Sequence, residues 1–202
     1  FSSRRRHTRF RNVTGVQTCA LPICHDCWNT PVDFVADVIQ FFGGPVELDP
    51  CSNSEIKEEQ NVPALNVYTQ KTNGLAHDWI ANTVFMNHPY SNSKEWVPYA
   101  VQQHECGNAR ELVLLIKLDI STKWWASVSK YPWIAVNKRL KFGNKSDGNA
   151  APFQSAIVYL GHRLDLFNDY FGKYGTLYVP YDSSQTVHKN THKHPIHAMI
   201  TK

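Results

Sequence analysis

Apolar residues recur along the chain in alternating helical and extended patterns. Between residues 32 and 42 they fall on one face of a predicted helix, made of Phe34, Val35, Val38, Ile39 and Phe42. A Gly-Gly-Pro break then precedes a short apolar strand at 46–48. The same patterns predict helices at 94–103, 124–128 and 164–171, and strands at 84–86, 112–118, 133–136, 156–160 and 176–179.

This alternation of strands and helices indicates an α/β fold. The segment 112–118 is apolar at nearly every position, which is typical of a central strand that is buried on both faces. We therefore predict a Rossmann-like fold with a mainly parallel sheet and helices on both faces. The final strand is a candidate for antiparallel pairing.

Composition is consistent with one folded domain. The 202 residues are 42% hydrophobic and 12% aromatic, enough for one sizeable core. The formal net charge is +4, with ten histidines counted as neutral. Such a surface suits a polyanionic partner, although its charge density is far below that of a histone-like protein. We expect no membrane span.

The two ends of the chain differ from the middle. Segment 1–24 is rich in arginine, shows no helical or strand period, and resembles the translation of a sequencing-adapter read-through, so we expect it to be non-native or disordered and the native start to be missing. The alternative is a basic arm that grips phosphates. No long apolar segment indicates a signal peptide. We expect residues 25–181 to form the domain and 182–202 a polar tail rich in histidine and lysine.

Cysteine spacing gives a weak indication of a metal site. Cys24 and Cys27 form a C-x-x-C pair that needs two further ligands to bind zinc, and the candidates are the tail histidines at 188, 192, 194 and 197. Cys51 and Cys106 extend no such pattern. We expect reduced thiols, no metal and a cytoplasmic protein.

The tetrapeptide Asn87, His88, Pro89 and Tyr90 follows the apolar strand at 84–86. The oxygen of Asn87 and a neighbouring backbone carbonyl can accept both hydrogens of a planar amine, and Tyr90 can stack on its ring. Pro89 fixes φ and stiffens the turn, and open α/β sheets bind ligands at such strand ends. The alternative is an Asn-led turn with a buried tyrosine.

Asp49 ends the first predicted strand. A carboxylate there can bind a ribose hydroxyl or orient an amino group of a cofactor, whereas the alternative is a simple Asp-Pro turn. The motif G-x-G-x-x-G is absent. Upstream, we expect Thr30 to cap the helix at 32–42 and Pro31 to lie in its first turn, which would direct backbone N–H groups toward an anion.

Five segments resemble one family in type and order. They are Asp-Cys-Trp-Asn-Thr-Pro at 26–31, Glu-Leu-Asp-Pro-Cys-Ser at 47–52, Asn-Gly-Leu-Ala-His-Asp-Trp at 73–79, Asn-His-Pro-Tyr-Ser at 87–91 and Arg-Leu-Lys-Phe at 139–142. Together they resemble the phage-type DNA N6-adenine methyltransferases, which are Dam-like, over roughly residues 26–161. The resemblance implies an S-adenosylmethionine-dependent methyltransferase fold, double-stranded DNA as the substrate, and a phage or prophage gene expressed in the cytoplasm of a bacterial cell. We expect a monomer.

The resemblance also assigns site residues. Asn87, His88, Pro89 and Tyr90 would form the catalytic motif. The cofactor would contact Trp28, Thr30, Pro31, Asp49, Cys51 and Asp78, the last at the position that meets its adenine.

His88 departs from the family pattern, which has proline at this position. The backbone carbonyl serves at this position of the motif, and histidine also has one. Losing a proline costs up to ~1 kcal/mol of pre-organisation, so we expect His88→Pro to raise or preserve activity. The imidazole could also add pH dependence.

DNA contacts are expected mainly after the catalytic motif, because few residues separate Asp49 from Asn87. The best candidate is a basic loop with Lys138, Arg139, Lys141 and Lys145, and Lys123 beside two tryptophans is a second. The alternative is a solvated hairpin of ordinary lysines.

Two other functions stay open. The acceptor could be another planar amine or amide, such as an RNA adenine or a protein glutamine. Alternatively, the chain could be a catalytically lapsed DNA-binding remnant, in view of His88 and the unusual start.

Overall fold

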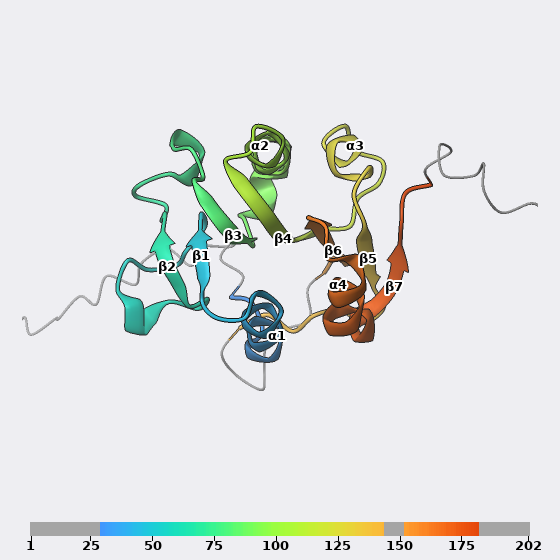
Figure 1. Cartoon of the computed structure of the whole chain (residues 1–202), viewed down its shortest axis with the longest axis horizontal. Helices are drawn as coiled ribbons and strands as arrows, with labels where there is room; N and C mark the ends of the chain where they lie inside the picture. The colour runs from blue at the N-terminus through green and yellow to red at the C-terminus, as the bar shows by residue number, and fades with distance from the viewer. Residues whose placement is uncertain (1–28, 144–151, 182–202) are drawn as a thin grey trace, which may run out of the picture.

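The computed structural model describes residues 29–143 and 152–181, which form three layers with a sheet in the middle (Figure 1). Trp28, Lys145, the terminal segments 1–24 and 182–202, and the proposed zinc ligands lie outside the described residues.

The sheet has seven strands in the order β2-β1-β3-β4-β6-β5-β7. Their bounds are β1 Val46–Asp49, β2 Ala64–Val67, β3 Ala81–Met86, β4 Ala109–Lys117, β5 Trp133–Val136, β6 Ser155–Leu160 and β7 Gly175–Tyr178. The sequence patterns predicted all of these except β2, a four-residue strand, Ala-Leu-Asn-Val, whose apolar residues do not alternate with polar ones.

Strand direction changes halfway across the sheet. Strands β2, β1, β3 and β4 are mutually parallel, whereas β6 is antiparallel to both β4 and β5, and β7 is antiparallel to β5. The prediction of a mainly parallel sheet therefore holds for one half, and the sheet as a whole is mixed. Hydrophobic patterns do not record pairing, and the consecutive strands β5 and β6 pair directly, as antiparallel neighbours do. The antiparallel final strand is confirmed.

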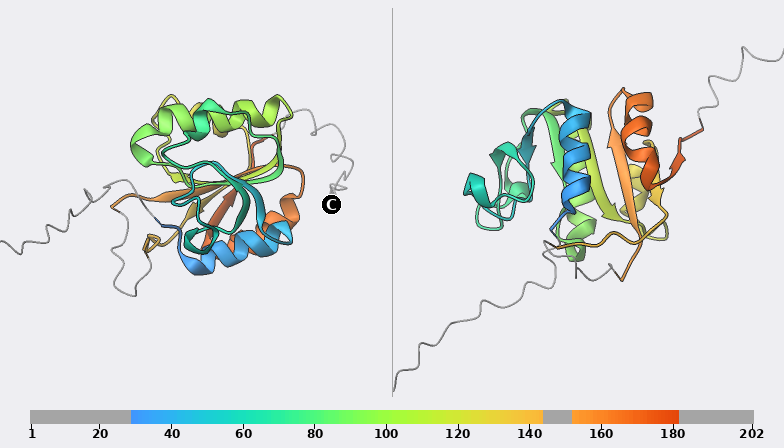
Figure 2. Two further views of the ribbon diagram at one scale, coloured as in Figure 1. Left: turned by 90° about the vertical axis from the view of Figure 1, so that its left-hand side faces the viewer. Right: turned by 90° about the horizontal axis from the view of Figure 1, so that it is seen from below.

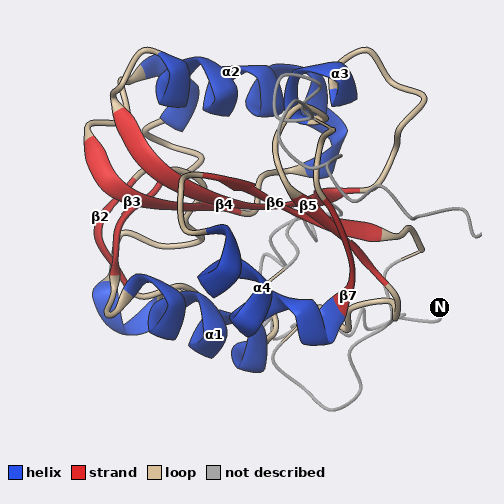
Figure 3. Ribbon diagram, turned by 45° about the vertical axis from the view of Figure 1, so that its right-hand side comes forward, coloured by secondary structure: helices blue, strands red, loops and turns tan. Residues whose placement is uncertain are grey.

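Helices cover both faces of the sheet (Figure 3). Helices α2 Ser93–Glu105 and α3 Trp125–Val128 lie on one face, and α1 Val32–Phe42 and α4 Leu164–Phe171 on the other. Figure 2 shows α1 and α4 side by side on their face. Four short 3-10 turns occur at Lys57–Glu59, Gly74–Ala76, Tyr90–Asn92 and Gly172–Tyr174. In the described residues no helix is long and apolar enough to cross a membrane.

Strand β4 supplies core residues to both layers. Val113 and Leu115 pack with the α1 and α4 side, whereas Leu112, Leu114 and Ile116 pack with the α2 and α3 side. Because successive strand residues point to opposite faces, burial of both faces requires an apolar residue at each position. This explains the uninterrupted apolar run in the sequence.

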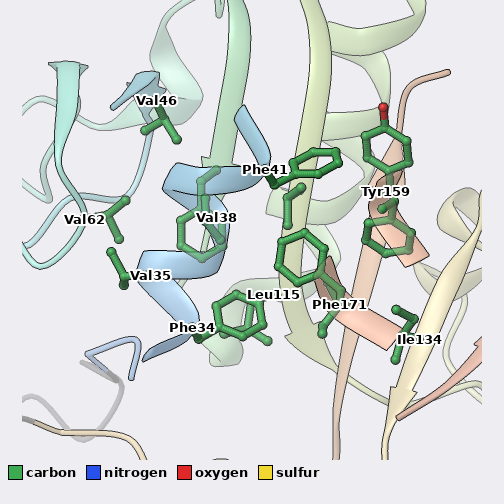
Figure 4. Close-up of a cluster of buried hydrophobic side chains, with 14 of the residues drawn as sticks. Phe34, Val35, Val38, Phe41, Val46, Val62, Leu115, Ile134, Tyr159 and Phe171 are labelled. Atoms are coloured by element: carbon green, nitrogen blue, oxygen red, sulfur yellow. The ribbon is translucent and has the colours of Figure 1, made fainter. Parts of the chain in front are cut away.

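Helix α1 packs through Phe34, Val38 and Phe41, all fully buried (Figure 4). Phe41 meets the ring of Tyr159 edge-on at 5.4 Å. Ile39 and Phe42, which were predicted on this face, are partly buried and pack against the same core, whereas the fully buried Phe41 was not singled out. Counted from Phe34, the helix positions i+4 and i+7 are Val38 and Phe41. These three residues therefore lie on the face that contacts the sheet. Gly43, with φ of 82°, ends the helix, as left-handed glycines commonly do.

An ion pair ties α4 to the sheet and to α1. The Arg163 Nε donates to Glu111 Oε1 at 2.9 Å, its Nη1 donates to the Phe41 carbonyl, and its guanidinium lies 4.7 Å from the Phe41 ring. The Tyr159 hydroxyl donates to the same Glu111 oxygen at 3.0 Å. Burial acts to raise the pKa of Glu111, but hydrogen bonds from Arg163 and Tyr159 outweigh burial and hold the pKa below its ordinary value.

We expect Arg163→Ala to lower the free energy of unfolding by about 2 kcal/mol, because the half-buried Glu111 carboxylate would lose its charged partner. Chemical denaturation at neutral pH measures this change. The control is Arg110→Ala, which removes an exposed arginine beside Glu111 and should cost little. Equal losses in the two variants would contradict the assigned role.

Candidate active site

A cleft of about 1070 Å³ opens where β1 and β3 end. Because these strands are parallel, their carboxyl ends meet at one edge of the sheet, as open α/β sheets require for ligand binding. The walls of the cleft include Thr30, Asp49, Cys51, Asn61, Asn87 and Trp96. Polar and apolar side chains therefore converge in one concave site, as expected of a ligand pocket.

Asp49 is the last residue of β1 and is only 5% exposed. Its Oδ1 accepts the backbone N–H of Cys51 at 2.9 Å. Burial raises the pKa of Asp49 to about 7, and the Cys51 hydrogen bond opposes this rise. Burial, together with the Asp49 charge, also raises the pKa of the Cys51 thiol well above its ordinary value, so Cys51 is a poor nucleophile at neutral pH.

Thr30 is held by an amide from a distant loop. Asn61 accepts the Thr30 N–H at 2.7 Å and donates to the Thr30 carbonyl at 3.1 Å. The prediction that Thr30 caps α1 was wrong, because the N-cap position belongs to Pro31 and no side chain caps the helix there. The Thr30 hydroxyl instead accepts a hydrogen bond from the Asn87 side chain in the cleft.

Asn87, the first residue after β3, is fixed at both ends of its amide. Its Nδ2 donates to Thr30 Oγ1 at 3.0 Å, and its Oδ1 accepts the Tyr90 hydroxyl at 2.9 Å. An amide is planar, and its oxygen lone pairs lie in that plane. The two contacts therefore fix the direction in which the Asn87 oxygen accepts hydrogen bonds.

Tyr90 lies beside the cleft and does not line it. Its ring meets Phe153 edge-on at 4.8 Å and Phe142 at 6.3 Å. Phe142 belongs to the loop after β5, and the next residue, Gly143, donates its N–H to the Asn29 carbonyl at 3.2 Å. This loop therefore crosses the carboxyl edge of the sheet to reach the start of the described chain.

Four of the five basic residues that were predicted to contact DNA fall in the described part of the chain, and these four are exposed on loops at this edge. Lys138, Arg139 and Lys141 lie on the loop after β5, and Lys123 lies on the loop after β4. Strand β5 points in the same direction as β4, because β6 is antiparallel to both. Four positive charges are thus carried by the edge that holds the cleft.

Gly74, which the sequence analysis did not assign to the site, lies close to the chain that follows β1. A Cβ on Gly74 would lie 2.3 Å from the Pro50 carbonyl oxygen, so only glycine fits here without a shift of the chain after β1. The Gly74 carbonyl accepts the indole N–H of the buried Trp79 at 2.9 Å. Gly74 thus allows close packing against Pro50, which lies between Asp49 and Cys51.

The structure brings some predicted residues together and leaves others apart. Among the predicted site residues, the cleft is lined by Thr30, Asp49, Cys51, Asn87 and Pro89. Those that lie outside the lining are Pro31, Asp78, His88 and Tyr90; Asp78 is exposed and His88 is buried. Sequence reasoning missed Asn61, Gly74, Trp96 and Phe153, whose roles depend on contacts between segments far apart in the chain. Of these four, only Gly74 belongs to a motif recognised in the sequence, the segment at 73–79.

In the described part of the chain, no three His, Cys, Asp or Glu side chains come together as metal ligands do.

Comparison with known proteins assigns the family. The family model for DNA N-6-adenine-methyltransferase (Dam) matches residues 18–190. The DNA N-6-adenine-methyltransferase of Haemophilus phage HP1 is 32% identical over 126 residues, covering 61% of this chain and 69% of that protein. The DNA N-6-adenine-methyltransferase of Escherichia phage T1 is 24% identical over 176 residues, which cover 85% of this chain and 69% of that protein. The chain therefore belongs to the phage-type Dam family of DNA N6-adenine methyltransferases, and the resemblance seen in its motifs is confirmed.

The Asp49 pKa makes the stability of the ligand-free protein depend on pH. Its folded pKa of about 7 exceeds the ~3.9 of an unfolded chain, so its contribution is fully present below pH ~4 and is lost as pH rises through 7. The loss amounts to up to about 4 kcal/mol. We expect Asp49→Asn, which cannot ionise, to be more stable than the parent at pH 8 by a margin about three times the margin at pH 5, because only part of the loss has occurred at the lower pH. Urea denaturation at both pH values measures this.

The control is Asp169→Asn, which changes an exposed carboxylate on α4. It should follow the parent at both pH values. A parent and Asp49→Asn protein of equal stability at pH 8 would contradict the raised pKa.

Proposed function

We propose that this protein transfers a methyl group from S-adenosylmethionine to the exocyclic N6 of adenine in double-stranded DNA. The observation that carries the proposal is the Asn87 amide, which Thr30 and Tyr90 hold in a fixed orientation at the cleft edge of β3. Family membership supports the reaction class.

The cleft is proposed to hold S-adenosylmethionine, which supplies a sulfonium-bound methyl group. Its volume of about 1070 Å³ exceeds what a cofactor of this size needs and leaves room for a base. The buried Asp49 carboxylate suits a ribose hydroxyl or an amino group, and Thr30 and Cys51 line the same cleft. The aromatic face of Trp96 can stabilise a nearby cation. Trp28, Pro31 and Asp78 are proposed as further cofactor contacts on the resemblance alone.

The strand order is consistent with a Rossmann-like methyltransferase fold. Four parallel strands carry the cleft at their carboxyl ends, and the antiparallel β6 is inserted between β4 and β5. We assign residues 25–181 to this domain.

Asn87 is proposed to bind and orient the target amine. The nitrogen of an adenine amino group shares its lone pair with the ring, so it is a weak nucleophile. Hydrogen bonds from its two N–H groups to the Asn87 oxygen and to a backbone carbonyl at Asn87 or His88 would localise the lone pair and point it at the methyl group. Orientation of this kind can supply most of the rate enhancement.

The base must leave the duplex to reach the cleft. Flipping costs a few kcal/mol, which stacking and groove contacts offset. Tyr90 is proposed to stack on the flipped base, since its ring is supported from the side by Phe142 and Phe153. The reaction is a direct transfer, because the buried Cys51 is held as a thiol and is not suited to attack the base.

The basic loops at the cleft edge are proposed to bind DNA phosphates. Lys138, Arg139, Lys141 and Lys123 are exposed and lie at the edge through which a flipped base would enter. Contacts of this type position the duplex without reading its sequence. We further propose a monomer that acts in the cytoplasm of a bacterial host and is encoded by a phage or prophage.

Asn87→Ala is expected to lower methylation by at least about 100-fold, because the amine would lose its oriented acceptor. The measurement is N6-methyladenine by mass spectrometry in unmethylated duplex DNA incubated with S-adenosylmethionine. Asn66→Ala, an exposed asparagine on β2, is the matched control and should retain activity. Substantial product from Asn87→Ala would overturn the proposed role.

The same assay separates the proposed acceptor from the other two functions. RNA oligonucleotides and glutamine-containing peptides are offered in parallel. Methylation of one of these without methylation of DNA would move the proposal to that acceptor. DNA binding without binding of S-adenosylmethionine would favour a lapsed enzyme.

Replacing Lys138, Arg139 and Lys141 together with alanine is expected to weaken DNA binding and flatten its salt dependence. The slope of log affinity against log salt should fall by about one unit for each phosphate that the variant no longer neutralises. Fluorescence anisotropy with a labelled duplex at several salt concentrations measures it. The control pair Arg110→Ala and Lys130→Ala removes charge elsewhere and should leave the slope unchanged.

A further inference from the structure

His88 takes the place of a proline in the catalytic motif, yet its side chain does not point into solvent. It is 2% exposed and lies outside the cleft lining, between the motif and the start of α2. Its Nε2 lies 2.9 Å from the Oγ of Ser93, the first residue of α2, which is itself buried. A buried polar contact of this kind is strong enough to fix the geometry of a turn.

The direction of this hydrogen bond follows from the contacts of Ser93. The Ser93 hydroxyl has one proton, and it donates that proton to the Tyr90 carbonyl at 2.8 Å. Toward His88 the same oxygen can only accept. His88 therefore donates from Nε2, which fixes the proton on that nitrogen.

The two bonds close a loop around the motif. From His88 the chain of contacts runs through Ser93 to the Tyr90 backbone, and the Tyr90 hydroxyl donates to Asn87 Oδ1 at 2.9 Å. The His88 ring also meets the Tyr90 ring edge-on at 5.5 Å. Tyr90, whose hydroxyl binds Asn87, is thus connected to His88 through Ser93.

We infer that His88 is a positioning residue that holds the Asn87–Tyr90 turn against α2 through Ser93, in place of the backbone restraint that proline gives. This inference rests on the proposed function, since it concerns the geometry of the same site. Proline stiffens a turn by fixing φ. A buried histidine leaves φ free but ties the turn to a helix that packs on the sheet through Trp96, Val97 and Ala100.

Two substitutions that differ in the position of one N–H test the inference. A glutamine amide places its nitrogen near the position of histidine Nε2, whereas an asparagine amide reaches only the position of Nδ1. We expect His88→Asn to lower kcat about 10-fold with little change in KM for S-adenosylmethionine, and His88→Gln to restore most of the loss. Equal kcat values for the two variants would overturn the inference.

A second test uses Ser93. We expect Ser93→Ala to lower kcat in the parent by a similar factor and to add little to His88→Asn, because both remove the same bond. In a His88→Pro background, the turn is held by its own backbone, so Ser93→Ala should cost almost nothing. If Ser93→Ala lowered kcat by the same factor in the His88→Asn and His88→Pro backgrounds as in the parent, Ser93 and His88 would not act together. Binding of S-adenosylmethionine, measured by calorimetry, and thermal melting confirm that each variant is folded.

The protonation of the His88 ring can be measured without catalysis, so this measurement tests the inference separately from the proposed function. In protein labelled with ¹⁵N-histidine, the imidazole nitrogen shifts report which nitrogen carries the proton. We expect His88 in the Nε2–H form, and a change in its Nε2 signal in Ser93→Ala. If the protein methylates no DNA but this signal is observed, the proposed function fails and the positioning role stands. A His88 signal with the proton on Nδ1 alone would overturn the inference whatever the activity.

Discussion

The site depends on one amide that is held between segments far apart in the chain. Asn87 emerges from the end of β3, where the backbone alone would leave its side chain able to rotate. Thr30 accepts from one end of the amide and Tyr90 donates to the other. Thr30 is itself clamped by Asn61 through two hydrogen bonds to its backbone. Because each net hydrogen bond contributes only about 1 kcal/mol, the value of this arrangement lies in fixed orientation more than in stability.

The sheet makes this arrangement possible. Parallel pairing of β1 with β3 brings Asp49 and Asn87 to the same edge. Two hydrophobic layers, one under α1 and α4 and one under α2 and α3, hold these strands rigidly. On this support, the loops carry the chemistry, as is usual for functional sites on rigid scaffolds. The contacts of Arg163 with Glu111 and with the Phe41 carbonyl join the start of α4 and the last turn of α1 to β4.

Much of the fold was predictable from the sequence, because helix and strand periods are local. Every α-helix and every strand of the described residues was found except β2, which is short and lacks alternation of apolar and polar residues. The antiparallel direction of β7 was predicted, but that of β6 was not, since the pairing of strands leaves no local signal. Within the site, Asn87 and Asp49 were found from their places after apolar strands. The hydrogen bonds of Asn61 to Thr30 and the need for glycine at position 74 could not be predicted, because each depends on which loops lie together.

Thr30 illustrates how a correct residue can carry a wrong role. A threonine directly before a proline that could start a helix is typical of a cap. In the structure its hydroxyl faces Asn87 instead, and α1 begins without a side-chain cap. A local hydrogen bond was exchanged for one that orients a site residue, an example of local rules giving way at a functional site.

The burial of Asp49 has a consequence for ligand binding. With its pKa raised to about 7 by burial, Asp49 binds a proton in part of the ligand-free molecules at neutral pH. A ligand whose hydroxyl or ammonium groups require the ionised carboxylate must displace that proton. Binding is then accompanied by proton release to the surrounding buffer, so the heat of binding depends on the ionisation enthalpy of the buffer chosen. The cleft therefore couples its occupancy to the proton concentration of the cell.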